Sequence, residues 1–348
     1  MMEAVVIHAL KDLRLDTLQG APAPGPGEVR IAVSHGGICG SDLHYYLHGG
    51  FGTIRIREPM ALGHEVSGIV TDLGAGVSGV SEGDRVAINP SRPCNECEYC
   101  LRGMANHCLD MRFAGSAMRV PHEQGFFRAQ LTLPARQAVR LSRKADLALT
   151  AMSEPLAVCL HAVAQAGSLI GKRVAVSGCG PIGCLTIAAA RLAGAEEIVA
   201  TDISAAALEV ARIMGADRVI NLAAQEGALE PLQAGKGQVD VLFECSGAPA
   251  AVVAGCSILR PRGAMVTVGL GPETPLPMTV IVAKELRLMG SFRFDPEFAT
   301  AARLIDSGRL DVKPLLTGVL PVAQAQEAFE LAADKSRAMK VQIAFPEP

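Results

Sequence analysis

Residues 171–184 have the sequence Gly-Lys-Arg-Val-Ala-Val-Ser-Gly-Cys-Gly-Pro-Ile-Gly-Cys, near the middle of the 348-residue chain. The apolar run 173–177 predicts a β-strand, and the alanine-rich pattern that continues to Leu192 predicts a helix. Between them lies a Gly-x-Gly-x-x-Gly motif, whose glycines permit a tight turn, close approach of a pyrophosphate and close helix–strand packing. The free N–H groups of a helix N-terminus favour phosphate. We therefore predict a dinucleotide site that includes Gly178, Gly180, Pro181, Ile182 and Gly183.

An acidic residue follows the next predicted strand. The apolar run 198–201 ends at Asp202, which lies 24 residues after Gly178. A carboxylate at this spacing accepts a hydrogen bond from the ribose 2′-hydroxyl and repels a 2′-phosphate. No arginine follows in residues 203–207, so we expect NAD as cofactor, with NADP as the alternative. Further cofactor contacts are expected at Ile203, Ser246, Val268, Gly269, Leu270, Ser291, Phe292 and Arg293.

The bulk composition limits the class of protein. A chain of this length suggests two domains, and a net charge of -3 with no tryptophan gives no sign of a nucleic-acid or acidic-membrane partner. Residues 1–8 lack a basic leader and predict a first strand rather than a signal peptide. We expect a cytoplasmic protein, in which ten cysteines indicate metal binding or chemistry rather than disulfides.

The pattern of predicted elements changes near residue 150. Before it, short β-like runs separated by glycine and proline predict a β-rich, barrel-like domain. After it, strands alternate with helices, which predicts an α/β domain with a doubly wound parallel sheet. We assign residues 150–288 to a Rossmann-type domain, and residues 1–149 together with 289–348 to the β-rich domain.

Four cysteines lie close together in the β-rich part. Cys94, Cys97, Cys100 and Cys108 have the spacing Cys-x2-Cys-x2-Cys-x7-Cys. Four thiolates can enclose one tetrahedral Zn²⁺ with no open position, which is typical of a structural site. An iron–sulfur cluster is an alternative, but the spacing of the fourth cysteine and the lack of a second cluster motif favour zinc.

A second group of potential ligands is spread along the chain. Cys39 lies in Gly36–His44, and His64 and Glu65 lie in 63–65, two segments that we expect to be short loops. Glu154 begins a predicted helix. Three protein ligands with an open fourth position are typical of a catalytic zinc, which lowers the pKa of a bound hydroxyl. Each of these residues is equally compatible with a structural role. They are far apart in sequence, so their spacing alone does not show that they meet at one metal ion.

In this order, the segments 36–44 and 63–65, the four-cysteine lobe and the turn 178–183 resemble the zinc-dependent medium-chain dehydrogenase/reductase family over essentially the whole chain. Glu154, in place of a cysteine, resembles the polyol (sorbitol) dehydrogenase branch. The resemblance implies a GroES-like β-rich catalytic domain, a Rossmann NAD-binding domain, two Zn²⁺ per chain and hydride transfer between NAD and an alcohol carbon.

The resemblance also implies roles for individual residues. The matches of Cys39, His64 and Glu65 hold the catalytic zinc, and the match of Glu154 acts directly or through water, so the third ligand is left open between Glu65 and Glu154. Ser41 takes the hydroxyl proton and passes it outward through a nicotinamide ribose hydroxyl and His44.

The substrate inference rests on finer resemblance. The segments 87–91, 110–118 and 290–294 resemble members of this branch that act on a sugar acid. Arginine suits a substrate carboxylate, and Arg112, Arg119 and Arg293 lie in segments that resemble substrate-cleft positions, with His122 nearby. We expect Arg293 to be a cleft residue and leave the carboxylate partner open.

Two alternatives are kept. The chain could act on sorbitol, xylitol or L-threonine, or it could be a non-catalytic member of the family. A non-catalytic member is expected to lose the open-site ligands or the proton relay, and this chain keeps both sets of residues. The family further implies a homodimer or homotetramer, paired through the sheet edge near residues 264–288.

Overall fold

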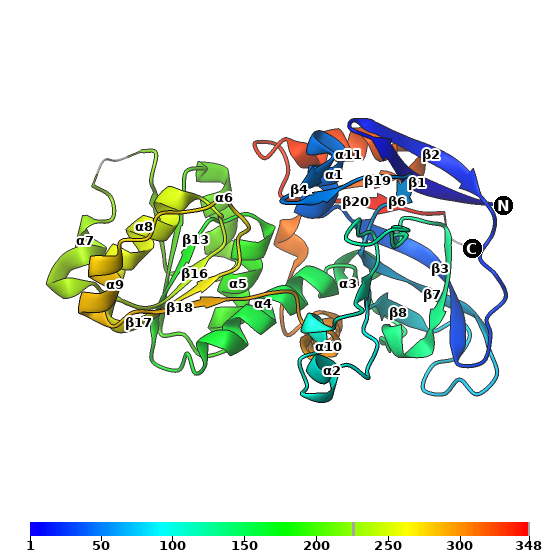
Figure 1. Ribbon diagram of the computed structural model, residues 1–348, viewed down its shortest axis with the longest axis horizontal. Helices are drawn as coiled ribbons and strands as arrows, with labels where there is room; N and C mark the ends of the chain where they lie inside the picture. The colour runs from blue at the N-terminus through cyan, green and yellow to red at the C-terminus, as the bar shows by residue number, and fades with distance from the viewer. Residues whose placement is uncertain (225–226, 347–348) are drawn as a thin grey trace. The chain divides into compact units, whose positions relative to one another are not determined.

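The computed structural model describes residues 1–224 and 227–346 and is drawn in Figure 1. The chain forms two compact units. Unit 1 contains Met1–Glu154, Phe298–Arg309 and the segment from Leu316 to the C-terminal end, and unit 2 contains Pro155–Glu297 and Leu310–Leu315.

Unit 2 is built on a six-stranded parallel sheet with the order β15-β14-β13-β16-β17-β18. The strands are β13 (Arg173–Ser177), β14 (Glu197–Asp202), β15 (Arg218–Asn221), β16 (Val239–Glu244), β17 (Leu259–Thr267) and β18 (Arg287–Gly290). The chain starts at a central strand, moves outward to one edge and then returns to build the other half. The predicted doubly wound sheet is confirmed, and its strands share one carboxyl edge, where ligands of such sheets bind.

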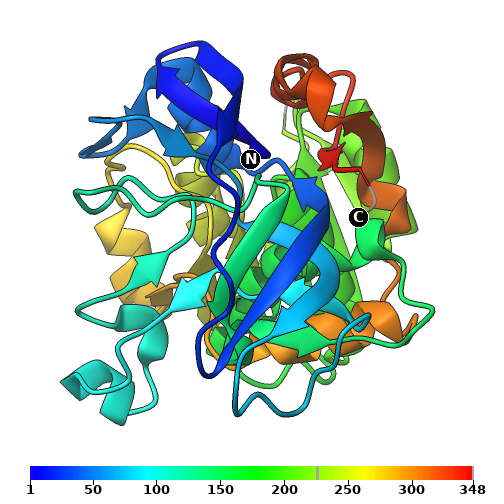
Figure 2. The ribbon, with the colours of Figure 1, turned by 90° about the vertical axis from the view of Figure 1, so that its right-hand side faces the viewer.

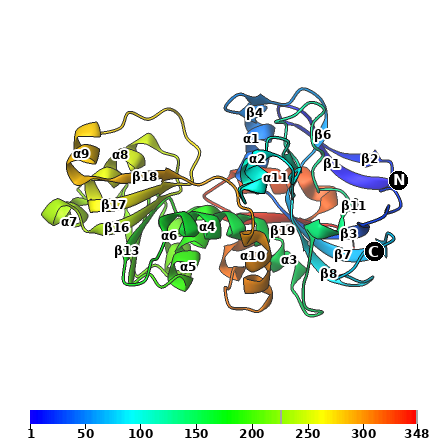
Figure 3. The same cartoon turned by 60° about the horizontal axis from the view of Figure 1, so that its bottom comes forward.

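Helices cover both faces of this sheet, as Figure 3 shows. They are α4 (Ser153–Ala166), α5 (Pro181–Leu192) and α6 (Ala205–Ile213) on one side, and α8 (Pro249–Ile258) and α9 (Met278–Lys284) on the other. The described part of the crossover between β15 and β16 contains the four-residue α7 (Glu230–Gln233) and a short 3-10 helix, Ala234–Lys236. Val174, Val176, Ile198 and Val199 are fully buried, as expected for strands covered on both faces.

Unit 1 contains a seven-stranded, mostly antiparallel sheet with the order β12-β8-β7-β3-β20-β19, with β11 also paired to β3. The strands are β3 (Glu28–Gly37), β7 (Glu65–Leu73), β8 (Arg85–Ile88), β11 (Gln130–Pro134), β12 (Ala138–Arg140), β19 (Leu316–Pro321) and β20 (Lys340–Ala344). Figure 2 faces this sheet, with the blue β3 between β7 and the green β11. A smaller sheet, β2-β1-β6, combines β1 (Met2–Ala9), β2 (Asp12–Leu18) and β6 (Met60–Ala61).

The helices of unit 1 are few. α3 (Leu147–Thr150) and α11 (Ala325–Ala333) contact the strands, and α10 (Glu297–Asp306) starts in unit 2 and continues in unit 1. Phe329 of α11 packs edge-on against Phe127 in the core. The prediction of a β-rich domain is confirmed. The C-terminal part of the chain contributes β19 and β20 to the same sheet.

One predicted loop is a helix. The ligand segment around Cys39 was expected to be a loop, but Gly40–His48 forms α1, which ends at Gly49 in the left-handed conformation. Asp42 closes a capping box by accepting a hydrogen bond from the Cys39 N–H at 3.0 Å. Cys39 is therefore the N-cap of a helix, which fixes its backbone more firmly than a loop would.

Among the described residues, no helix is both long and apolar enough to span a bilayer. All ten cysteines are free thiols.

Candidate active site and metal centres

The four-cysteine lobe lies between two short paired strands of unit 1. β9 (Ser91–Arg92) and β10 (Arg112–Phe113) pair with each other, so the intervening segment is closed at its base. The ligand atoms of Cys94, Cys97, Cys100 and Cys108 all lie within 4.8 Å of one another. The predicted closed cluster is therefore assembled in space.

Backbone N–H groups point at these sulfur atoms. The N–H of Cys97 lies 3.4 Å from the Cys94 sulfur, and those of Cys94 and Asp110 lie 3.2 and 3.3 Å from the Cys108 sulfur. Backbone N–H donors lower the pKa of Cys97 to about 6, whereas burial raises that of Cys100 to about 12. Donors aimed at several sulfurs suit thiolates, and four adjacent thiolates require a cation. The donor set fits zinc.

The second metal cluster consists of Cys39, His64 and Glu65, whose ligand atoms also lie within 4.8 Å of one another. Cys39 lies between the end of β3 and the start of α1, and Glu65 begins β7. The pairing of β3 with β7 sets Gly37 opposite Glu65 and so brings the two ligand segments together. His64 and Glu65 are buried. Burial and the nearby Glu65 raise the pKa of the Cys39 thiol to about 12, so this cluster needs a metal ion to hold the thiolate form.

Asp42 connects the two ligand segments, and it was not among the predicted site residues. This fully buried carboxylate accepts hydrogen bonds from the N–H groups of Cys39 and Gly63, at 3.0 and 3.2 Å. It also lies 3.8 Å from Nδ1 of His64, a buried nitrogen that has no hydrogen-bond partner among the described residues. A carboxylate facing a histidine nitrogen is the usual support of a metal-binding imidazole. The Cys39-x-x-Asp42 capping pattern was the signal that could have identified it.

Glu154 and Lys340 complete the charged surroundings of this cluster. Glu154, in the first turn of α4, is 6% exposed, and its burial together with nearby Glu65 and Cys39 raises its pKa to about 8. Lys340 of β20 is buried against Glu65, with Nζ 2.8 Å from both carboxylate oxygens. Burial lowers the pKa of Lys340, but the charges of Glu65 and Cys39 outweigh this and raise it overall. Lys340 was not predicted, because its partner lies 275 residues away.

The proposed proton-relay residues both lie on α1. Ser41 is half-buried and His44 is exposed, and the spacing of three residues places them on one side of the helix. The ring of His44 lies 5.7 Å from that of His48 and 5.9 Å from that of Phe51. Partial burial and His48 lower the pKa of His44, so its imidazole is neutral at pH 7 and able to accept a proton.

The predicted carboxylate-binding candidates of unit 1 already have partners. Arg112 donates to Glu123 at 2.8 Å, and Arg119 forms an ion pair with Asp110. His122 is buried, accepts from the Arg57 N–H at 2.9 Å, and its Nδ1 lies 2.6 Å from the Arg119 carbonyl oxygen. A substrate carboxylate at Arg112 or Arg119 would have to share the guanidinium with the acidic residue that already binds it.

The glycine turn of unit 2 connects β13 to α5. Gly178 has φ +87°, and a Cβ there would lie 2.8 Å from the Ser246 nitrogen. A Cβ on Gly183 would lie 1.8 Å from the Gly178 oxygen, whereas a Cβ on Gly180 would have no atom within 4 Å. Pro181 and Ile182 are the first residues of α5, whose N-terminal N–H groups lack intrahelical partners. Open space at Gly180, beside these groups, fits a phosphate group.

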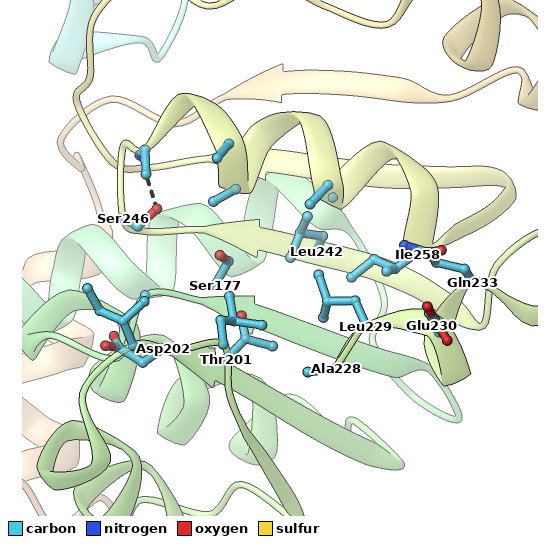
Figure 4. Close-up of a pocket in the computed structure, with 18 of the residues that line it drawn as sticks. Ser177, Thr201, Asp202, Ala228, Leu229, Glu230, Gln233, Leu242, Ser246 and Ile258 are labelled. Carbon is cyan, nitrogen blue, oxygen red and sulfur yellow. Dashed lines mark hydrogen bonds between the residues drawn. The ribbon is translucent and has the colours of Figure 1, made fainter. Parts of the chain in front are cut away.

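A cavity of about 600 Å³ adjoins this turn. Figure 4 shows Asp202 and Ser246 toward one end, and Glu230, Gln233 and Ile258 toward the other. Gly178 and Ile203 also line it. The Asp202 carboxylate is fixed by the N–H groups of Cys179 at 2.6 Å and Ser204 at 2.8 Å. The cavity therefore has a fixed acceptor at the end of β14, where a ribose hydroxyl is expected.

The remaining predicted cofactor residues follow the next strands of the sheet. The N–H groups of Val268 and Gly269 donate to the backbone carbonyl oxygen of Glu244, at 2.8 and 2.9 Å. These bonds place residues 268–270 beside the Ser246 loop. Ser291 follows β18 and donates its N–H to Thr267 at 2.9 Å. Arg293 has φ +53°, and its guanidinium lies 4.9 Å from the centre of the Phe292 ring. These loops share the carboxyl edge of the sheet, although the residues from Val268 to Arg293 do not line the cavity.

Two family models match the chain. The model described as zinc-binding dehydrogenase matches residues 181–307, and that described as alcohol dehydrogenase GroES-like domain matches residues 25–143. The chain belongs to the zinc-binding dehydrogenases, the medium-chain family that its sequence resembles. It is an NAD(P)-dependent dehydrogenase that acts on CH–OH groups.

Individual relatives refine this placement. L-idonate 5-dehydrogenase (NAD(P)(+)) of Escherichia coli K12 is 45% identical over 90% of this chain and 91% of its own length. Sorbitol dehydrogenase of Gallus gallus is 38% identical over 94% of this chain and 92% of its own. The crystal structure of the E. coli L-idonate enzyme has a TM-score of 0.95 at 43% identity, and the match covers 99% of this chain and 98% of the other. The chain is thus similar to L-idonate 5-dehydrogenase and to sorbitol dehydrogenases.

Proposed function

We propose that this chain oxidises a secondary alcohol of a sugar acid, and that the substrate is L-idonate, which becomes 5-keto-D-gluconate. The observation that carries the proposal is the higher identity to the L-idonate enzyme, over nine-tenths of both chains, than to the sorbitol enzyme. One hydride leaves the carbinol carbon and one proton leaves its hydroxyl, so the products are the ketone, NADH and H⁺.

The residues of unit 1 supply the metal site of this reaction. Cys39, His64 and a carboxylate of Glu65 or Glu154 would hold a zinc ion, which when bound polarises a substrate hydroxyl and lowers its pKa. Asp42 holds the two ligand segments together through its bonds to Cys39 and Gly63. Cys94, Cys97, Cys100 and Cys108 would hold a second zinc with no open position.

The residues of unit 2 supply the cofactor site. The start of α5 binds the pyrophosphate, and the open space at Gly180 lets it approach the backbone. Asp202 accepts from the adenosine ribose and disfavours a 2′-phosphate, and residues 203–207 contain no basic side chain that could neutralise such a phosphate. NAD is therefore the preferred cofactor in this proposal.

A proton leaves the site through α1 in this proposal. Ser41 takes the hydroxyl proton, and neutral His44, exposed on the same helix, delivers it to solvent. Ser41→Ala should lower kcat by about 10²-fold, the lower range for positioned proton transfer, while the Kd for NADH stays within about twofold. Steady-state kinetics and NADH fluorescence titration measure the two quantities. Ser78→Ala, in an exposed loop of unit 1, is the matched control; a kcat for Ser41→Ala close to that of this control would remove Ser41 from the relay.

The proposal is tested by a substrate screen. L-idonate, sorbitol, xylitol and L-threonine are each supplied with NAD and with NADP, and the appearance of reduced cofactor is followed. We expect the highest kcat/KM with L-idonate and NAD. A comparable or higher value with sorbitol would overturn the substrate assignment, and a preference for NADP would overturn the role given to Asp202.

A polyol is the second candidate substrate. Arg112 and Arg119 are each engaged by an acidic residue of unit 1, which favours a substrate without a carboxylate. In the same screen, sorbitol or xylitol would then give the highest kcat/KM, while dependence on zinc and NAD would be unchanged.

A further inference from the structure

A turn of unit 1 at residues 116–123 is closed by its own backbone. Ser116 and Glu123 exchange two N–H···O bonds, both 3.2 Å long. The N–H of Ala117 donates to the hydroxyl oxygen of Tyr45, a buried side chain of α1, at 3.0 Å. The turn is therefore attached to the helix that carries the proposed relay residues.

A hairpin of unit 1 packs on the same helix. Its strands β4 (Gly50–Phe51) and β5 (Ile54–Arg55) pair with each other directly after α1. The centre of the Phe51 ring lies 5.9 Å from that of His44 and 5.5 Å from that of Tyr45. The hairpin therefore contacts the imidazole that delivers the proton to solvent in the proposed relay.

His122 joins the turn to the chain that follows this hairpin. Its backbone N–H donates to Oε1 of Glu58 at 2.5 Å, and its Nε2 lies 2.9 Å from the backbone nitrogen of Arg57. Its Nδ1 lies 2.6 Å from the carbonyl oxygen of Arg119, within the turn. His122 is 5% exposed, so water cannot readily replace these bonds.

The partners of the His122 ring determine its charge. A carbonyl oxygen only accepts, so Nδ1 must carry a proton, and a backbone N–H only donates, so Nε2 must be unprotonated. The imidazole is therefore neutral when both bonds are made. A second proton on the ring would set an N–H of His122 against the N–H of Arg57 and break the link to the hairpin.

The charged groups around His122 come from its own turn, from the chain after the hairpin and from the strands and loop at the base of the four-cysteine lobe. They are Arg119 and Glu123, then Arg57 and Glu58, and then Arg92, Asp110 and Arg112. The arginines at 92, 112 and 119 are each in an ion pair with an acid of this group. Because the linked ring is neutral, the link is present at high pH and is lost as the pH falls.

We propose that His122 is a positioning residue whose neutral ring ties the β4–β5 hairpin to the turn 116–123. It thereby holds Phe51 against His44. The inference rests on the proton relay of the proposed function. When the ring is protonated, the link at Arg57 opens and the hairpin loosens over α1. Proton delivery then slows, because the relay imidazole is held less firmly in its orientation.

Amide hydrogen exchange of residues 50–58, corrected for the intrinsic rate at each pH, tests the link without any substrate. Between pH 8 and pH 5.5, a range in which histidine changes its charge, protection in the wild type should fall by about threefold to tenfold, the effect of about one hydrogen bond. His122→Gln places an amide oxygen that accepts at every pH near the Nε2 position, so its protection should change by less than about twofold. His122→Ala should show low protection at both pH values. His8→Gln, which removes a histidine bonded to Asp16 in the same unit, is the matched control and should behave as the wild type.

Two exchange results would overturn the inference. One is a wild type in which the protection of residues 50–58 changes by less than about twofold. The other is a His122→Gln protein that loses as much protection as the wild type, which would assign the change to another group. If His122→Ala does not fold, these two proteins decide.

Steady-state kinetics at pH 8 test the positioning role. His122→Ala should lower kcat by about threefold to tenfold, with KM and zinc content within about twofold of the wild type, and His122→Gln should restore kcat. An unchanged kcat, or a raised KM for L-idonate at unchanged kcat, would contradict the role, since the second result makes His122 a substrate contact. A wild type that oxidises none of the screened alcohols would instead refute the proposed function, and the exchange experiment would still decide whether His122 links the two segments.

Discussion

Replacing Cys39 with alanine should remove one of the two zinc ions that we propose for each chain and lower kcat by about 10³-fold or more. Metal polarisation of a substrate oxygen contributes several kcal/mol to transition-state stabilisation, and each 1.36 kcal/mol is a factor of ten in rate. Cys39 supplies the only thiol of the cluster with His64 and Glu65, so its loss leaves two ligands. Metal analysis and steady-state kinetics measure the two effects.

Two variants control this experiment. Cys256→Ala removes a buried thiol of unit 2 that donates to the Val252 carbonyl oxygen at 3.5 Å, and it should retain both zinc ions and a normal kcat. Cys97→Ser should also lower the zinc content to one, by opening the four-cysteine lobe. A Cys39→Ala protein with two zinc ions, or with kcat within tenfold of the wild type, would contradict the assignment of Cys39 as a ligand of a catalytic zinc.

The sequence predicts those parts of the molecule that depend on local pattern. The strand 173–177 and the helix that follows the glycine turn are found as expected, because an apolar run and an alanine-rich pattern determine them within twenty residues. The four-cysteine lobe is local in the same sense, since its four thiols span fifteen residues. The helix α1 was missed because Gly40-Ser41-Asp42 resembles a turn, although Asp42 completes the capping box of that helix with the N-cap residue Cys39.

The contacts around the open metal cluster depend on sheet topology instead. Lys340 reaches Glu65 only because β20 and β7 both pair with β3, and no pattern near either residue indicates that pairing. Arg112 and Arg119 were selected for their charge, but that charge is already paired with Glu123 and Asp110. A single sequence shows which residues carry charge, whereas the partner of each charge depends on long-range packing.

The second large effect concerns the two glycines that flank the start of α5. Gly183→Ala should destabilise unit 2 by about 3 kcal/mol, the upper range for overpacking, because its Cβ would lie 1.8 Å from the backbone oxygen of Gly178. Gly180→Ala should cost less than about 1 kcal/mol, since Gly180 has φ −66° and a Cβ there has no neighbour within 4 Å. Urea unfolding midpoints compare the two variants.

The same pair separates folding from cofactor binding. If the space at Gly180 belongs to the pyrophosphate, a methyl group there clashes only in the complex, and a clash of about 1–3 kcal/mol weakens NADH binding by about tenfold to a hundredfold. Gly180→Ala should therefore be stable but bind NADH poorly in a fluorescence titration, whereas Gly183→Ala should be unstable. Normal NADH affinity in a folded Gly180→Ala protein would mean that the phosphates do not approach this turn, and the cofactor site would have to be placed elsewhere along the carboxyl edge of the sheet.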